Sequence, residues 1–331
     1  MKKKILFGLV LLLIISGCGD KTENVDIPTI TTKELFTGSD GLIVEFVKGN
    51  PPAEVYENSF TPITLNIKNK GAYDIQNGII SIALEKDYIT AQQNSFNSVN
   101  TNTRYEGQEH LSLNIKGKNI ETAEGEEDQL NFLANIGELE DMSIEHESGI
   151  IISSCYKYQT ELSDNICIDT DLFGTKTVEK PCETQSKSYT NQGAPIAIQE
   201  VEMAMLPDLD NGVIRPQIII HIINVGDGEV VADDTSTITK ACSSQALEID
   251  KWNKINVEAR MGANHIFNCN PSSDSGIAKV TLKERNAKVR CIIENGINIE
   301  EGTRAEPLYI KLNYGYTSSI SKTIKINKLK P

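Results

Sequence analysis

The histidines have the widest chemical range of the side chains, and their spacing matches no known metal or catalytic motif. They are His110, His146, His221 and His265. Neither the H-x-x-x-H nor the H-E-x-x-H spacing of zinc enzymes occurs. The G-x-S-x-G turn of hydrolases, the P-loop and the G-x-G-x-x-G fingerprint are also missing. We therefore expect no catalytic residue, no metal and no cofactor.

One short acidic stretch has part of a calcium-loop pattern. Asp208, Asp210 and Asn211 supply oxygen atoms before Gly212, which suits a tight turn. No bidentate Glu follows at the expected position, and Asn-Gly is also a preferred two-residue hairpin turn. We favour the turn, with calcium binding at Asp208 and Asp210 as the alternative.

Other carboxylates pose the same question more weakly. We interpret Asp169 and Asp171 as solvated loop carboxylates. The acidic run from Glu121 to Asp128 could attract cations or a basic partner, but a solvated loop between strands is the simpler interpretation. In the triplet Asn270-Pro271-Ser272, the proline blocks N-glycosylation.

Four tyrosines form two pairs with a period of two, namely Tyr156 with Tyr158 and Tyr314 with Tyr316. In a strand, residues two apart lie on the same face. Each pair could belong to an aromatic binding strip or could pack in a core or at a sheet edge. We favour packing.

The elements that must position these residues are short strands. Apolar and polar residues alternate in runs separated by Gly, Asn, Asp and Glu, and no helical period is sustained. The predicted strands cover 41–47, 63–69, 79–84, 111–115, 132–136, 150–158, 196–205, 218–223, 277–282, 289–293, 308–316 and 320–326. This pattern predicts an all-β fold of antiparallel sandwiches.

Two internal matches indicate a duplication. The run 63–71 aligns with 218–226, and both end in Asn-x-Gly. In this alignment His221 falls on Asn66, opposite the apolar face, so we expect it to face solvent. Residues 155–168 align in the same way with 313–326.

The matches lie near the start and end of each half of the chain. We therefore predict two copies of one domain, at 41–188 and 195–331, joined by a linker at 189–194. A length of 331 residues is consistent with two domains of about 150 residues each.

The strands that end in Asn69-Lys70-Gly71 and Asn224-Val225-Gly226 resemble the second core strand of CARDB-type immunoglobulin-like domains. The Tyr-x-Tyr segments are similar to the last strands of such domains, which are common on archaeal and bacterial surface proteins. The resemblance implies two tandem immunoglobulin-like sandwiches and a surface location. It implies no catalytic residues.

The N-terminus resembles an export signal. Residues 1–17 have a basic start and an apolar run from Ile5 to Ile15, which is shorter than a membrane span. The ending Ile15-Ser16-Gly17-Cys18 resembles the lipobox of prokaryotic lipoproteins, in which Cys18 would receive the lipid and become the first mature residue. An uncleaved helix or a plain signal peptide is the alternative. Residues 18–40 are polar, and we interpret them as a lipid-anchored tether.

The charge balance argues against two classes of partner. The formal net charge is −14, and removal of residues 1–17, which hold three lysines and no acid, leaves −17. Nucleic acid needs a basic surface, and anionic lipid attracts basic segments. We expect neither nucleic acid nor charge-driven membrane docking.

Apart from Cys18, the chain has six cysteines and no C-x-x-C motif. An even number in an exported protein predicts disulfides. From a hairpin turn near Glu161, placed to match its counterpart near Ser318-Ser319, we predict Cys155–Cys167, because opposed strand residues lie about 4.5 Å apart. We pair Cys269 with Cys291 because they lie near neighbouring strands. Elimination leaves Cys182–Cys242.

Together these features predict a non-catalytic lipoprotein on the outer face of the cell membrane. It would present two immunoglobulin-like domains to a surface protein or glycan, in adhesion, envelope structure or complex assembly. A substrate-capture lipoprotein of a transporter and an extracellular hydrolase with an unrecognised site are the alternatives.

Overall fold

The computed structural model describes residues 35–98, 103–107, 110–177, 179–243, 245–271 and 277–329. The predicted signal peptide, Cys18 and the tether up to residue 34 lie outside the described residues. The fold is all-β, with 56% strand, and the described residues include the short α-helix α2 (Thr235–Ala241). None of the described helices is long and apolar enough to cross a membrane.

The described strands form three sheets, and two of these sheets each lie within one half of the chain. The five-stranded sheet has the order β1 (Leu42–Phe46), β3 (Ser59–Asn69), β9 (Glu127–Ile136) and β5 (Ile89–Ala91), with β6 (Asn97–Ser98) also on β9. The six-stranded sheet has the order β11 (Lys187–Ser188), β12 (Ile196–Asp208), β13 (Val213–Asn224), β19 (Asn286–Ile292) and β17 (Asn268–Asn270), with β20 (Ile297–Asn298) also on β13.

The ten-stranded sheet is shared by both halves. Its order is β16 (His265–Ile266), β15 (Lys254–Met261), β21 (Arg304–Asn327), β10 (Glu145–Ile168), β4 (Ile75–Leu84), β8 (His110–Ile115) and β7 (Thr103–Gly107). β2 (Glu54–Tyr56) and β14 (Glu229–Val231) also pair with β21, and β18 (Ala278–Thr281) pairs with β15. Among the described strands, only β2 with β21 is a parallel pair.

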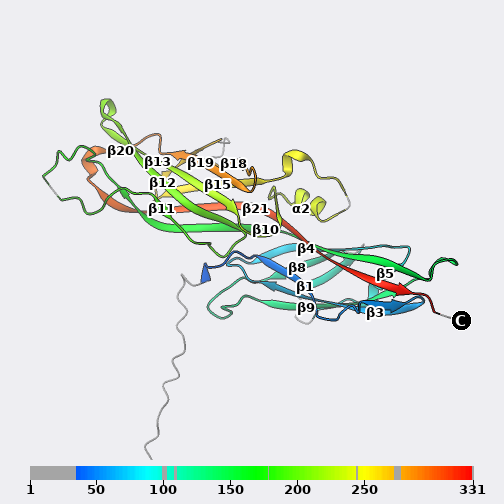
Figure 1. Ribbon diagram of the computed structural model, residues 1–331. Helices are drawn as coiled ribbons and strands as arrows, with labels where there is room; N and C mark the ends of the chain where they lie inside the picture. The colour runs from blue at the N-terminus through cyan, green and yellow to red at the C-terminus, as the bar shows by residue number, and fades with distance from the viewer. Residues whose placement is uncertain are drawn as a thin grey trace, which may run out of the picture.

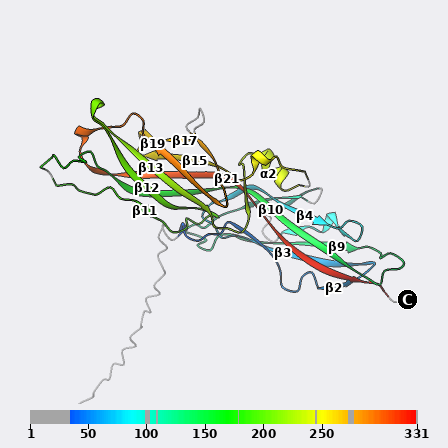
Figure 2. The ribbon, with the colours of Figure 1, turned by 45° about the horizontal axis from the view of Figure 1, so that its top comes forward.

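Two strands of 24 residues join the halves. β10 and β21 pair antiparallel along their whole length, from Glu145 opposite Asn327 to Ile168 opposite Arg304. They run side by side through both halves of the molecule (Figures 1 and 2). The first part of β10 pairs with β4 in the N-terminal half, and the first part of β21 pairs with β15 in the C-terminal half.

This pairing corrects the predicted division of the chain. Residues 317–327, assigned to the unit 195–331, lie beside β10 in the N-terminal half. Residues 156–168, assigned to the unit 41–188, lie in the C-terminal half. The units therefore exchange strand segments, because each long strand continues where the sequence predicted a turn.

The predicted linker at 189–194 is packed rather than free. Gln192 is buried, and its side-chain amide bonds both backbone groups of Ile198. The Gly193 N–H donates to the carbonyl of Gly38, and its carbonyl accepts from Ala72. This segment therefore holds the start of the described chain against both halves.

The internal duplication is visible in the sheet order. β1 pairs with β3 and β3 with β9, as β12 pairs with β13 and β13 with β19. The repeats meet where Lys157 of β10 lies opposite Gly315 of β21, between the pairs Tyr156–Tyr316 and Tyr158–Tyr314. One contiguous core cluster covers both halves, with members such as Ile67, Ile152, Ile220 and Leu312.

The structure forms three disulfides, and one of the predicted pairings is among them. Cys269 bonds Cys291, its register partner on the neighbouring strand. Cys155–Cys167 is wrong, because both residues lie on the single strand β10, twelve positions apart, which at about 3.3 Å per residue places them too far apart to bond. The predicted pair Cys182–Cys242 is also wrong, because each of these two cysteines bonds a different partner.

The observed bonds are Cys155–Cys242 and Cys167–Cys182. The first joins β10 to the C-terminal end of helix α2, where Val231 and Ile238 complete a small apolar cluster. Together the three disulfides indicate an extracellular, oxidising location.

Candidate binding face

The four tyrosines lie buried where the repeats meet, as the packing interpretation predicted. Their exposed fractions are 4% or less. The Tyr158 hydroxyl donates to Asn69 Oδ1 at 3.3 Å, and Tyr316 donates to Asn224 Oδ1 at the same distance. The two Asn-x-Gly motifs are therefore equivalent in the structure.

Two of the tyrosine hydroxyls also accept from a backbone N–H at or just before the start of a strand. Tyr156 accepts from the backbone N–H of Leu42, and Tyr316 accepts from that of Gly228. Burial raises the pKa of Tyr316 to about 12 and also raises the pKa values of Tyr156 and Tyr158. These neutral hydroxyls complete the core and are unavailable as a binding strip.

The uncovered polar surface lies on the other side of the same strands. Even-numbered residues of β10 from 148 to 162 are buried in the core, so its odd-numbered residues from 157 to 163 point outward. We call the outward residues of β10, β21 and β15 in the C-terminal half the outer face. Its register rows are Gln159–Asn313–Asn256, Glu161–Lys311–Glu258 and Ser163–Tyr309–Arg260.

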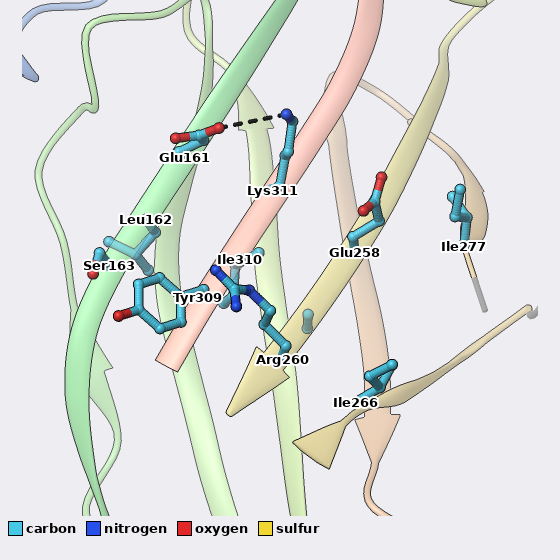
Figure 3. A pocket seen from close by; sticks show the side chains of 11 residues that line it. Glu161, Leu162, Ser163, Glu258, Arg260, Ile266, Ile277, Tyr309, Ile310 and Lys311 are labelled. Atoms are coloured by element: carbon cyan, nitrogen blue, oxygen red, sulfur yellow. Dashed lines mark ion pairs between the residues drawn. The ribbon is translucent and has the colours of Figure 1, made fainter. Parts of the chain in front are cut away.

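A cavity of about 320 Å³ opens on the outer face (Figure 3). The Arg260 guanidinium lies 4.4 Å from the centre of the Tyr309 ring, a cation–π contact. Lys311 Nζ lies 3.5 Å from Glu161 Oε1. Ile266 lines the cavity and is 72% exposed. The cavity thus combines an aromatic ring, both signs of charge and an apolar side chain.

A second cavity, of about 690 Å³, continues toward the junction of the two halves. It borders the outer face at Gln159 and Asn313, and amide and aromatic side chains form much of its lining. Its lining includes Phe36, Tyr73, Gln76, Gln159 and Asn313. Phe36 and Tyr73 contact each other, with ring centres 5.8 Å apart. Amides and aromatic rings bind a polar ligand through hydrogen bonds and stacking.

Strand pairing and a capped helix hold the side chains of the outer face in position. The face lies on three neighbouring strands of one sheet rather than on loops, so register fixes its side chains. Helix α2 packs over the junction and is capped by Asp234, which accepts from Thr237 N. The would-be Cβ of Gly315 would lie 3.1 Å from Ile238 of the helix and 2.7 Å from Val231, so glycine permits this approach.

The calcium alternative at Asp208 receives no support from its contacts. The hairpin turn that we favoured joins β12 and β13, but its loop is 209–212 with a 3₁₀ turn, longer than the two-residue Asn-Gly turn. The Asp208 carboxylate accepts from the backbone and side chain of Asn211 and pairs with Arg215 at 2.6 Å. These contacts hold its pKa below the usual range, first through the Asn211 side chain. Its oxygens are engaged by donors and by a cation of the chain itself.

Asp169 and Asp171 are buried, not solvated as expected. Burial alone raises the pKa of Asp169, but bonds from Lys180, the Asp171 N–H and Thr303 hold it below the usual value. Asp171 accepts from the backbone N–H groups of Lys176 and Thr175, which lower its pKa. Both carboxylates brace the loop closed by Cys167–Cys182 instead of offering ligands.

The acidic run at 121–128 is only partly solvated. Lys68 lies 3.9 Å from both Glu124 and Glu127, and Asp128 is buried. Among the histidines, His146 lies 3.0 Å from Glu85, and His221 faces outward on β13 between two carboxylates. These groups therefore contact neighbouring side chains of the chain itself.

The outer face was not expected from the sequence. Its residues alternate with the buried tyrosines and isoleucines of β10 and β21, so their period of two was visible. The expected turn near Glu161 hid it, because that turn would have separated Gln159 from Ser163 onto different strands. The segment that forms β15 was also not among the predicted strands.

Comparison with known proteins identifies no family. No family model and no curated protein matches the chain. A type I cohesin–dockerin complex from Clostridium thermocellum is 14% identical over 36% of this chain and 83% of that chain, with a TM-score of 0.25. The Enterococcus faecalis MSCRAMM ACE, described as binding its ligands by the collagen hug model, is 9% identical over 89% and 98%, with a TM-score of 0.14.

A protein of another class is similar to the same low degree. The secreted serine protease VesC from Vibrio cholerae is 11% identical over 83% of this chain and 50% of that chain, with a TM-score of 0.18. The resemblance to cohesin-like and adhesin-like β-domains is therefore distant. This resemblance does not indicate a function for the chain.

Proposed function

We propose that the chain is a non-catalytic lipoprotein, anchored through Cys18, that binds a surface protein or glycan with its outer face. The observation that carries this proposal is the row of outward side chains over three paired strands, with Tyr309 and Arg260 at the cavity. Strand pairing and disulfides hold the face in place before any ligand arrives. Such preorganisation favours binding, because little side-chain and loop ordering remains to be done.

The state of the buried carboxylates favours a binding role over hydrolysis. Asp169 and Asp171 accept several hydrogen bonds each, and buried Glu57 accepts from the backbone N–H groups of Leu139 and Leu329. Low pKa values hold the first two as anions. A general acid or base instead needs a pKa near the working pH.

Site-specific crosslinking on intact cells tests the binding role. A photoreactive phenylalanine at Tyr309 should crosslink to a partner, identified by mass spectrometry. The matched control is the same residue at Ile151, which points outward from β10 of the same sheet but in the N-terminal half and is 45% exposed. Crosslinks from Ile151 but none from Tyr309 would move the binding face elsewhere.

Fractionation tests the anchor separately. Replacement Cys18→Ser should leave the protein unlipidated and release it from membranes. If the variant stays with the membrane through an intact N-terminus, the segment 1–17 is a span and the lipid proposal fails. The crosslinking result does not depend on this outcome.

A further inference from the structure

Three side chains with metal-ligating atoms meet on the solvent face of the six-stranded sheet. Glu200 and Glu202 lie two apart on β12, and Glu200 is the register partner of His221 on β13. His221 Nδ1 lies 3.6 Å from Glu200 Oε2, and His221 Nε2 contacts Glu202 Oε1. One ligand atom from each residue lies within 4.8 Å of the others.

The group is neither buried in the core nor free in solvent. The exposed side-chain fraction is 18% for His221, 38% for Glu200 and 40% for Glu202. A bulge between Ile198 and Glu200 shifts the register at this point of β12. Bulges re-aim side chains next to functional sites.

The sheet itself does not need these residues. In the first repeat the register positions of Glu200, His221 and Lys288 correspond to Glu45, Asn66 and Gln129. There the Gln129 amide donates to Asn66 Oδ1 at 3.0 Å. The same position therefore folds with two amides, and the histidine with its second carboxylate is particular to the second repeat.

We propose that Glu200, Glu202 and His221 bind a divalent first-row transition metal, for which Zn²⁺ is the probe. Imidazole and carboxylate suit this class, whereas Ca²⁺ takes oxygen ligands alone. Zinc bonds of about 2.0–2.2 Å require ligand atoms to approach to about 3.3 Å. One ring nitrogen of His221 would bind the metal, and rotation of the partly exposed side chains would bring the ligand atoms from within 4.8 Å to this separation, with water completing the coordination shell.

The positive charge of Lys288 disfavours metal binding at this site. Its ammonium lies 3.8 Å from Glu202 Oε1, and it is the register partner of His221 on β19. A bound cation must displace this ammonium from the carboxylate. The Lys288 ammonium therefore competes with the metal for Glu202, and the Lys288→Gln variant should bind zinc more tightly than the parent protein.

Calorimetric titration with Zn²⁺ tests the site on the full chain with its disulfides intact. All samples carry Cys18→Ser, because a free thiol binds zinc. The parent should bind one Zn²⁺ at this site, and His221→Gln should weaken binding by at least about tenfold. Melting of His221→Gln without metal is measured alongside, and an unchanged melting temperature separates lost ligation from lost folding.

His146→Gln is the matched control. His146 also lies beside a carboxylate, Glu85, at 3.0 Å, but it has no second carboxylate partner among the described residues. Its loss should leave zinc affinity unchanged, and Ca²⁺ should not compete for the site. Equal affinity in His221→Gln and parent, an equal loss in His146→Gln, or no gain in Lys288→Gln would overturn the assignment.

Discussion

At the residue scale, two hydrogen-bonded pairs keep the repeats in register. Asn69 Oδ1 and Asn224 Oδ1 each accept from the N–H of a following glycine and from a tyrosine of the opposite layer. The tyrosines come from β10 and β21, so the same contacts close both halves. Removing one hydroxyl leaves a buried donor or acceptor without a partner.

Replacement Tyr316→Phe is expected to destabilise the protein and to change its response to alkali. At pH 7 the loss of the bond to Gly228 N should cost about 1–3 kcal/mol. Burial raises the Tyr316 pKa from 10.0 to about 12, so the unfolded chain releases this proton first. The stability due to this group is present below pH 10 and lost as pH rises toward 12.

Urea unfolding at pH 7 and pH 11 measures this effect. The difference between parent and variant at pH 7 reports the lost contacts, so only the change in that difference reports titration. The difference should shrink at pH 11. A constant difference at both pH values would contradict buried titration of Tyr316.

Replacement Gly315→Ala is expected to destabilise the protein where helix α2 packs against β21. The added Cβ would lie 2.7 Å from Val231 Cγ2 and 2.9 Å from the Ala232 carbonyl. Overpacking of this kind costs about 1–3 kcal/mol. Gly149→Ala is the matched control, because Gly149 also lies in β10–β21 pairing and has nothing within 4 Å of its would-be Cβ.

Thermal melting of both variants measures the contrast. Gly149→Ala should be neutral or stabilising, since alanine lowers the entropy of the unfolded chain. Equal melting temperatures for the two variants would mean that helix α2 does not press on β21.

At the element scale, the disulfides differ in how much chain they close. Cys155–Cys242 closes 87 residues, and Cys167–Cys182 closes 15. In the chain-entropy model these loops contribute about 4.6 and about 3 kcal/mol. The first bond also joins helix α2 to the shared sheet, so it links elements as well as loop ends.

We expect the paired replacement Cys155→Ala and Cys242→Ala to destabilise more than Cys167→Ala with Cys182→Ala. Urea midpoints of the two double variants give the order. Peptide mapping without reductant must first find the Cys155–Cys242 and Cys167–Cys182 peptides in the parent. A Cys155–Cys167 peptide would restore the hairpin near Glu161 and contradict the continuous strand.

At the scale of the whole molecule, the two repeats form one body through the shared sheet. The described chain ends at the tip of the N-terminal half, after β21 has passed through both halves (Figure 1). Neither 41–188 nor 195–331 contains all strands of its own half. Each fragment would leave the partner edge of a long strand unpaired, and such an edge associates with other chains.

Cleavage between the repeats should therefore leave them together. A protease site inserted between Gln185 and Ser186, which are both exposed, lies outside the Cys167–Cys182 loop but inside the loop that Cys155–Cys242 closes. The cut protein should run as one species on a denaturing gel without reductant, through Cys155–Cys242. After reduction it should still elute as one complex under native conditions.

The control for the cleavage is the cut protein with Cys155→Ala and Cys242→Ala. Its pieces should separate on every denaturing gel but co-elute on native size exclusion. If they separate natively, each repeat folds by itself as the sequence boundary predicts, and the shared sheet adds little stability.

The sequence alone determined the fold class, the repeat and one disulfide. Alternation with a period of two follows from local strand geometry, so the all-β fold could be predicted, as could the packing of Tyr156 and Tyr314. The matching Asn-x-Gly ends revealed the duplication for the same reason. Cys269 and Cys291 lie on strands that are near neighbours in the chain.

Only the tertiary structure decided how far β10 and β21 extend. A stretch such as 155–168 can turn back on itself or continue, and the choice depends on a partner strand that lies some 150 residues away in the sequence. That choice placed Cys155 beside Cys242 and assembled the outer face from β10, β21 and β15. Independently, the register between β12 and β13 brought His221 to Glu200 and Glu202, because register across strands, rather than spacing along the chain, sets which side chains meet.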